Sequence, residues 1–158
     1  MCAVLLRLLS REPDARALDP SCDSRALGSY VGGSGEKERF MALQVEEYAY
    51  EMIAALEPLM GRIRRRDRSL ADQLNRASAS VALNIAEGNG KRSLPDRIRY
   101  LEIARGSALE CAACLDVLVA RSRLASAVAS QGKAMLVRVV STITKLIERH
   151  LRDAASTS

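Results

Sequence analysis

Residues 101–118 read LEIARGSALECAACLDVL and carry a regular helical pattern. Apolar or small side chains recur at alternating spacings of three and four residues, which places them on one face of an α-helix. That face consists of Leu101, Ala104, Ala108, Cys111, Leu115 and Leu118. The stretch therefore predicts an amphipathic helix, and its small residues allow a partner helix to approach closely.

The same spacing predicts three more helices around this one. The first begins at Met41 and ends between Gly61 and Arg66, and Pro58 should kink it or end it early because proline lacks an amide donor. The apolar faces are Met41, Val45, Tyr48, Met52, Ala55 and Leu59 in the first helix; Leu70, Leu74, Ala77, Val81 and Ile85 in the second; and Leu136, Val139, Val140, Ile143, Leu146 and Ile147 in the fourth.

Capping residues mark the ends of these helices. Ser69, with an acidic residue three positions later, predicts the start of the second helix, and Gly88 predicts its end. Ser93 marks the start of the third helix, which has a proline in its first turn. The fourth helix begins at Ser126 or Ser130.

Composition supports an all-α fold. Ala, Leu, Arg, Glu and Lys make up about half of the 158 residues, whereas aromatic residues make up 3%. Such a chain is typical of long helices and unlike a β-sandwich or barrel. Because short loops force neighbouring helices to run antiparallel, we expect an up-down-up-down antiparallel four-helix bundle with a disordered N-terminal extension.

The chain divides into three parts. Residues 41–152 should form the bundle, and residues 153–158 a frayed tail. Residues 1–40 carry no net charge, are rich in glycine, and lose helical periodicity after Leu9, so we expect a disordered leader. The codons for the residues before Met41 can supply a ribosome-binding sequence, so we hypothesise that translation starts at Met41 and that the leader is mis-assigned.

Little in the sequence suggests catalysis. Cys111 and Cys114 form a CxxC pair without a second pair, and both lie on the apolar face of a helix, so we interpret them as core residues. The single histidine, His150, lies near a helix C-terminus, where a cation is favourable. We expect no enzyme activity, no metal and no cofactor. Apolar runs fall short of the roughly 18 residues of a membrane span, so we expect a cytoplasmic protein.

Arginines cluster at both ends of the second helix. The chain carries a net charge of +5, and the two basic groups are Arg62, Arg64, Arg65, Arg66 and Arg68, and Lys91, Arg92, Arg97 and Arg99. They suit the phosphates of RNA or DNA, in which case binding would be to the backbone with little base readout. The alternative is a protein-interaction scaffold, with no nucleic-acid contact, whose arginines serve only solubility.

A series of motifs from residue 70 to residue 110 is distinctive. It reads LADQL-x-RAS from Leu70, NIAEG from Asn84, and L-x-IARGS-x-x-E from Leu101. This series resembles the bacterial four-helix-bundle family of the 23S rRNA intervening-sequence protein, over roughly residues 42–150. A related branch is the accessory variability determinant of diversity-generating retroelements.

The resemblance implies a non-enzymatic four-helix bundle that assembles as a homopentamer with a basic surface. For the retroelement branch it also implies nucleic-acid binding and contact with a reverse transcriptase. The matching motif residues are Asn84, Glu87, Gly88, Arg105, Gly106 and Ser107. We expect them to have structural roles.

Specific contacts can be expected for three of these motif residues. We expect Glu87 to pair with Arg92 or Arg97 across the turn between the second and third helices. Arg105 should hydrogen-bond near Ser78 or cross a subunit boundary. Gly106, in the middle of a helix, suggests a close approach of another backbone.

Overall fold

The computed structural model describes residues 36–156, with side chains for residues 40–155. The described chain forms four α-helices and no strand: α3 (Glu36–Arg64), α4 (Arg68–Gly90), α5 (Leu94–Ala120) and α6 (Ser126–Ser156). Residues 1–35 of the expected leader and the last two residues of the expected tail lie outside the described residues.

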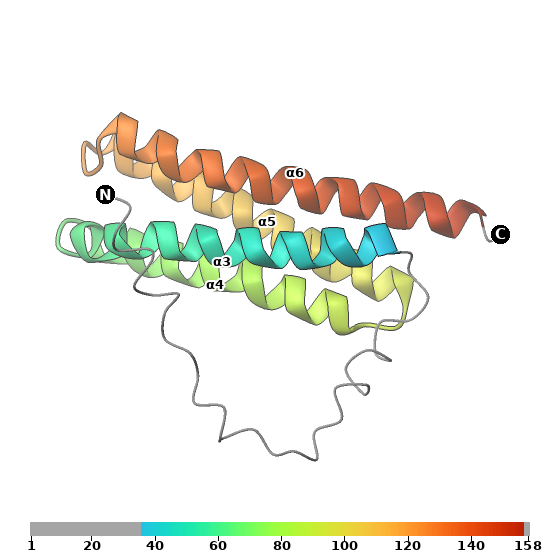
Figure 1. Cartoon of the computed structure of the whole chain (residues 1–158). Helices are drawn as coiled ribbons and strands as arrows, with labels where there is room; N and C mark the ends of the chain where they lie inside the picture. Colours follow the sequence, from blue (N-terminus) through green and yellow to red (C-terminus); the bar gives the residue numbers. More distant parts are fainter. Residues whose placement is uncertain (1–35, 157–158) are drawn as a thin grey trace, which may run out of the picture. The chain divides into compact units, whose positions relative to one another are not determined.

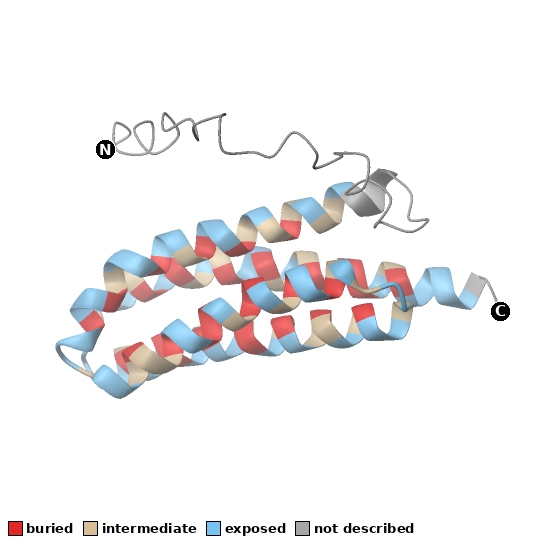
Figure 2. Cartoon of the chain, turned by 90° about the horizontal axis from the view of Figure 1, so that it is seen from below, coloured by how far each residue is buried: buried red, intermediate tan, exposed pale blue. Residues whose placement is uncertain are grey.

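The helices form the expected antiparallel bundle (Figure 1). Consecutive helices pack against each other, and α6 returns to pack against α3, so each helix contacts two neighbours. The α3–α4 and α5–α6 connections lie at one end of the bundle, and the α4–α5 connection lies at the other (Figure 1). Buried residues line the inward face of every helix (Figure 2).

Several helix boundaries differ from the expected ones. α3 begins at Glu36 rather than Met41, and it continues past Pro58 to Arg64, so an early end at the proline was wrong. Pro58 is exposed, so the helical hydrogen bond that is lost at this proline lies on the solvent side of α3 rather than in the core. α6 continues to Ser156, so most of the expected frayed tail is helical.

The caps of α4 also differ, while the cap of α5 is confirmed. Asp67, not Ser69, caps the N-terminus of α4, because its side chain accepts a hydrogen bond from the Leu70 amide. α4 ends at Gly90, two residues beyond the expected Gly88. Ser93 caps α5 as expected by accepting from the Asp96 amide.

The core follows the expected faces closely in three helices. All six residues predicted for α5 are buried, and so are four of the five predicted for α4. In α3 the predicted Ala55 is exposed, and Leu56 and Met60 are buried instead. A strict three-four alternation averages 3.5 residues per turn and drifts around a straight helix of 3.6, so the second half of this long helix buries a different set.

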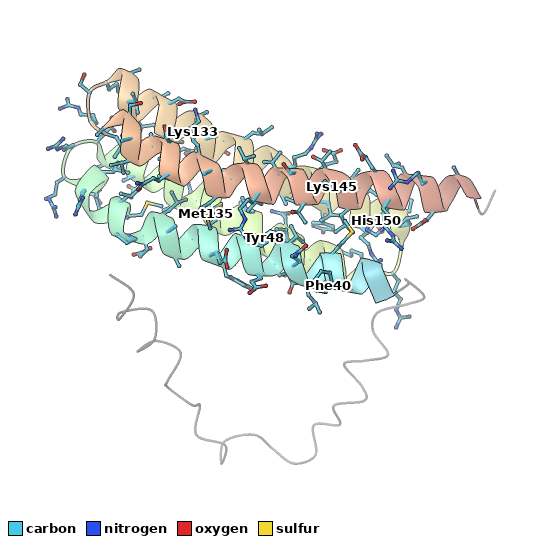
Figure 3. All side chains as sticks on the ribbon, turned by 45° about the horizontal axis from the view of Figure 1, so that its top comes forward. Phe40, Tyr48, Lys133, Met135, Lys145 and His150 are labelled. Carbon is cyan, nitrogen blue, oxygen red and sulfur yellow. The ribbon has the colours of Figure 1, made fainter. Side chains whose placement is uncertain are left out.

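The bundle is fastened on its α3–α6 side by an aromatic and ionic contact (Figure 3). The guanidinium of Arg138 on α6 lies 4.1 Å from the centre of the Tyr48 ring on α3. The same guanidinium pairs with Glu51 at 3.3 Å. These contacts lie on the outer surface where α3 packs against α6, and neither of them buries a charge.

Close packing of α6 depends on Gly132, whose significance the sequence pattern did not reveal. A Cβ atom at this position would lie 3.0 Å from Leu115 Cδ1 and 3.5 Å from Leu56 Cδ2. Gly106, where we expected a close approach, has no such neighbour within 4 Å in the described chain and is exposed. The tight contact within the bundle is therefore at α6, not at Gly106.

Candidate nucleic-acid interface

The first basic group surrounds the short α3–α4 connection. α3 ends at Arg64 and α4 starts at Arg68, so Arg62 and Arg64 lie in the last turn of α3, Arg65 and Arg66 in the connection, and Arg68 at the first residue of α4. The amides of Arg66 and Asp67 both donate to the Ile63 carbonyl, at 2.8 and 2.7 Å. These bonds hold the turn tightly and keep its arginines close together.

The α5–α6 connection adds two arginines to the same end of the bundle. Ser122 adopts a left-handed conformation with φ of 55°. Its amide donates to the Val119 carbonyl, and the Arg123 amide donates to the Leu118 carbonyl. This is a Schellman ending, which turns the chain sharply at the helix C-terminus. It brings Arg121 and Arg123 toward the α3–α4 connection.

We call the resulting cluster the arginine end, which consists of Arg62, Arg64, Arg65, Arg66, Arg68, Arg121 and Arg123. Sequence reasoning missed Arg121 and Arg123. The signal was available in the predicted topology, because an up-down-up-down bundle places its first and third connections at one end. Figure 3 shows side chains ending in nitrogen gathered at this end.

Two carboxylates neutralise part of the arginine end. Asp72 accepts from Arg64 at 3.1 Å and lies 3.8 Å from Arg68. Asp67 pairs with Arg121 at 2.8 Å. The hydrogen bond from the Leu70 amide, followed by the contact with Arg121, holds the pKa of Asp67 below its usual range. Asp67 therefore stays ionised and fastens the α5–α6 connection to the α3–α4 connection.

The remaining cations surround a hollow of about 350 Å³ between the two connections. We call it the arginine hollow; its lining is Leu59, Arg62, Ile63, Arg65, Arg66, Arg123, Leu124, Ala125 and Val128. Arg66 donates to the Arg123 carbonyl at 3.4 Å across it. Within residues 40–155, the guanidinium groups of Arg62, Arg65 and Arg123 have no carboxylate within ion-pair distance, so their charge is available to an anion.

The second basic group lies at the opposite end of α4, about 35 Å away for a helix of this length. Lys91 pairs with Glu87 at 2.5 Å and lies 4.9 Å from the centre of the Tyr100 ring. Arg97 is only 9% exposed and donates to the Lys91 carbonyl at 3.0 Å. Arg97 thus holds the α4–α5 turn and does not present its charge to solvent, while Arg92 and Arg99 are exposed.

Two motif residues join α4 to α5 through a polar chain. The Asn84 amide donates to the Ser80 carbonyl and hydroxyl, at 2.7 and 3.1 Å. The Ser80 hydroxyl lies 2.8 Å from that of Ser107, which donates to the Ile103 carbonyl. This chain fixes the register of the two helices.

Gly88 serves the same α4–α5 contact by a different means. A Cβ atom there would lie 3.2 Å from Tyr100 Cβ and 3.4 Å from the Arg97 carbonyl oxygen. The absence of a side chain therefore lets the end of α4 pack directly on the first turns of α5.

The expected contacts of Glu87 with Arg92 or Arg97 and of Arg105 with Ser78 were wrong, whereas a contact of Arg105 across a subunit boundary stays a prediction. Glu87 pairs with Lys91 rather than with Arg92 or Arg97. Arg105 pairs with Glu102 at 2.5 Å, one turn away on the same helix. Ser78, its expected partner, donates instead to the Asn75 carbonyl. Local pairs along one helix were favoured because residues three or four apart already face each other.

The two cysteines are free and buried, in agreement with a packing role. Burial raises the pKa of the Cys111 thiol to about 12 and also raises that of Cys114, so neither is an activated nucleophile. Across the described residues, no three His, Cys, Asp or Glu side chains gather as metal ligands would. His150 is 2% exposed and lies six residues before the end of α6, so it is a core residue rather than the cation at the helix C-terminus that we expected.

No helix in the described part of the chain is long and apolar enough to cross a membrane. A solved structure of similar fold is a protein of unknown function from the S23 ribosomal protein family of Bacteroides thetaiotaomicron, with 18% identity and a TM-score of 0.65. The match covers 68% of this chain and 98% of that one. A search of curated proteins finds no match.

The match to a family is more direct. The model of the family described as 23S rRNA-intervening sequence protein matches residues 42–145, which include α4, α5 and most of α3 and α6. This range covers well over half of the chain and contains the motif residues that join α4 to α5. The chain therefore belongs to the 23S rRNA-intervening sequence protein family.

Proposed function

We propose that this protein is a non-enzymatic helical bundle that binds the phosphate backbone of RNA or DNA through its arginine end. The proposal rests on one observation: Arg62 from the last turn of α3, Arg65 from the α3–α4 connection and Arg123 from the α5–α6 connection come together without a carboxylate within ion-pair distance in the described chain. Guanidinium groups bind phosphates by charge and by paired hydrogen bonds. We place this role in the cytoplasm.

The charge distribution favours the arginine end over the other basic group. At the α4–α5 end, Lys91 is paired with Glu87 and Arg97 is committed to the turn. Arg92 and Arg99 remain exposed there, so this end adds long-range attraction. We therefore propose direct phosphate contacts for the first group and a secondary contribution from Arg92 and Arg99.

We also propose that the chain assembles with copies of itself. Leu109 on α5 is 55% exposed and Val137 on α6 is 63% exposed. Both flank an apolar groove of about 150 Å³ between the two helices. Exposed Gly106 lies on α5 near this face and leaves room for a partner. Burying such a surface between subunits is favourable, and the family resemblance suggests a homopentamer.

Assembly would strengthen binding to nucleic acid. Each subunit of an oligomer repeats the same arginine end, and linked weak contacts combine through a high effective concentration. A nucleic-acid-processing enzyme such as a reverse transcriptase is a further candidate partner. The protein-interaction scaffold, with no nucleic-acid contact, is the competing function.

The test compares variants at the two ends of the bundle. Arg62→Gln/Arg65→Gln and the matched control Arg92→Gln/Arg99→Gln remove the same charge, and each variant changes one helical position and one position in a connection. Fluorescence anisotropy with labelled RNA and DNA should show a clear loss of affinity for the first variant and a smaller one for the control. Equal losses would mean that net charge alone drives binding. No binding by the wild type would favour the scaffold.

A further inference from the structure

The arginine hollow combines two kinds of surface. Its cations, Arg62, Arg65, Arg66 and Arg123, come from the last turn of α3 and from both connections. Its apolar lining comes from Leu59, Ile63, Leu124, Ala125 and Val128. A surface that only attracts phosphates needs no apolar lining, because phosphate groups stay solvated. The lining therefore points to a ligand that has an anionic part and a flat or apolar part.

The shape of the hollow is fixed by contacts between its two walls. Arg66 on one connection donates to the Arg123 carbonyl on the other at 3.4 Å. Asp67 and Arg121 form a second bridge at 2.8 Å. The left-handed Ser122 holds the α5–α6 turn in place, and the amide of Leu124 is bonded to the Leu118 carbonyl at 3.2 Å. The hollow is thus present before a ligand binds.

Its size suits a single small unit. A volume of about 350 Å³ lies near the lower end of the roughly 300–1,000 Å³ found for small-molecule sites. That volume accommodates one nucleotide with its base turned out of a strand. A base in a duplex is stacked and paired, so it cannot enter without being flipped out at a cost in free energy.

We propose that the arginine hollow receives one unpaired nucleotide of single-stranded nucleic acid. The guanidinium groups of Arg62, Arg65 and Arg123 hold the phosphates, and the base lies on the apolar lining. Single strands are bound elsewhere by cationic tracks combined with aromatic side chains on which the bases stack, whereas here aliphatic side chains cover the base. This inference rests on the proposed function and specifies its substrate as single-stranded rather than duplex nucleic acid.

The test fills the hollow without changing its charge. Ala125 is exposed and lines the hollow, and its carbonyl accepts from Val128 and Ala129, so Ala125→Leu adds volume and leaves those bonds intact. Ala127→Leu is the matched control, since Ala127 is exposed and outside the lining. Both variants should melt as the wild type does.

Three probes are compared across one salt series: a single-stranded DNA, the blunt duplex of the same sequence, and a single strand of abasic sites. The wild type should bind the single strand roughly fivefold more tightly than either other probe, the lower end of what one base stacked on an aromatic ring contributes, because the lining here is aliphatic. Ala125→Leu should lose this preference and keep its salt dependence, whereas Ala127→Leu should keep the preference.

Two results would overturn the inference in distinguishable ways. Equal binding of all three probes by the wild type, with Arg62→Gln/Arg65→Gln still weakened, would end the nucleotide-in-hollow idea and leave backbone binding intact. Unchanged binding by Arg62→Gln/Arg65→Gln would end both proposals. Arg123→Gln provides a second variant at the hollow, and it should weaken binding of the single strand more than binding of the duplex.

Discussion

Replacing Gly132 by alanine tests the packing of α6 against the rest of the core. Any Gly→Ala change inside an exposed helix should stabilise it by about 0.5–1 kcal/mol through helix propensity. At Gly132, however, the new Cβ would lie 3.0 Å from Leu115 Cδ1, and Leu115 is fully buried. Overpacking a core of this kind costs about 1–3 kcal/mol. We therefore expect Gly132→Ala to lower stability in spite of its better propensity.

Gly61→Ala is the matched control, because Gly61 lies within α3 and a Cβ atom added there would meet nothing within 4 Å. Gly61→Ala should gain only the stability that comes from the higher helix propensity of alanine. The two variants should then differ by about 1–3 kcal/mol, or roughly 4–12 °C in Tm for a domain of this size.

Urea denaturation followed by circular dichroism, at one fixed protein concentration, measures this difference. Adding Leu115→Val to Gly132→Ala removes the Cδ1 atom and should recover part of the lost stability. Equal stabilisation by Gly61→Ala and Gly132→Ala would refute the close contact between α6 and Leu115.

Three further outcomes follow from buried groups and exposed faces. Cys111 should react slowly with iodoacetamide at pH 8 in the folded protein and quickly in urea, because burial raises its pKa to about 12. Asp67 has a lowered pKa, so its stabilising contribution is present at neutral pH and is lost as the pH falls through the pKa of the folded state. Asp67→Asn keeps the cap acceptor, so its melting temperature should fall less on acidification than that of the wild type. Leu109→Glu should reduce the oligomeric mass in light scattering without loss of helix content.

The sequence predicted the fold well because each helix buries one continuous face. The α5 pattern held throughout: all six predicted residues are buried, and both α4 and α6 pack against this helix. The α3 pattern failed beyond Met52, because the buried face continues through Leu56 and Met60 with two consecutive spacings of four, in place of the strict three-four alternation. Cap choice at α4 failed because Asp67 and Ser69 are both good caps, and the contact between Asp67 and Arg121 is invisible in the local sequence.

The candidate site was only half predictable. The run from Arg62 to Arg68 is visible in the sequence, but its pairing with Asp72 and the commitment of Arg97 to a turn depend on geometry. Arg123 joins the site only through the topology of the bundle and the left-handed turn at Ser122. In an up-down-up-down bundle the first and third connections lie at the same end, so basic residues in those two connections belong to one surface.

The salt dependence of binding tests the central claim most directly. Binding of a single-stranded oligonucleotide should be measured across a salt series for the wild type and for Arg62→Gln/Arg65→Gln/Arg123→Gln. Each phosphate contact on a single strand contributes about 0.7 to the slope of log K against log salt concentration. The account predicts that the variant's slope is shallower by about 2 for each subunit in contact. An unchanged slope with unchanged affinity would contradict it.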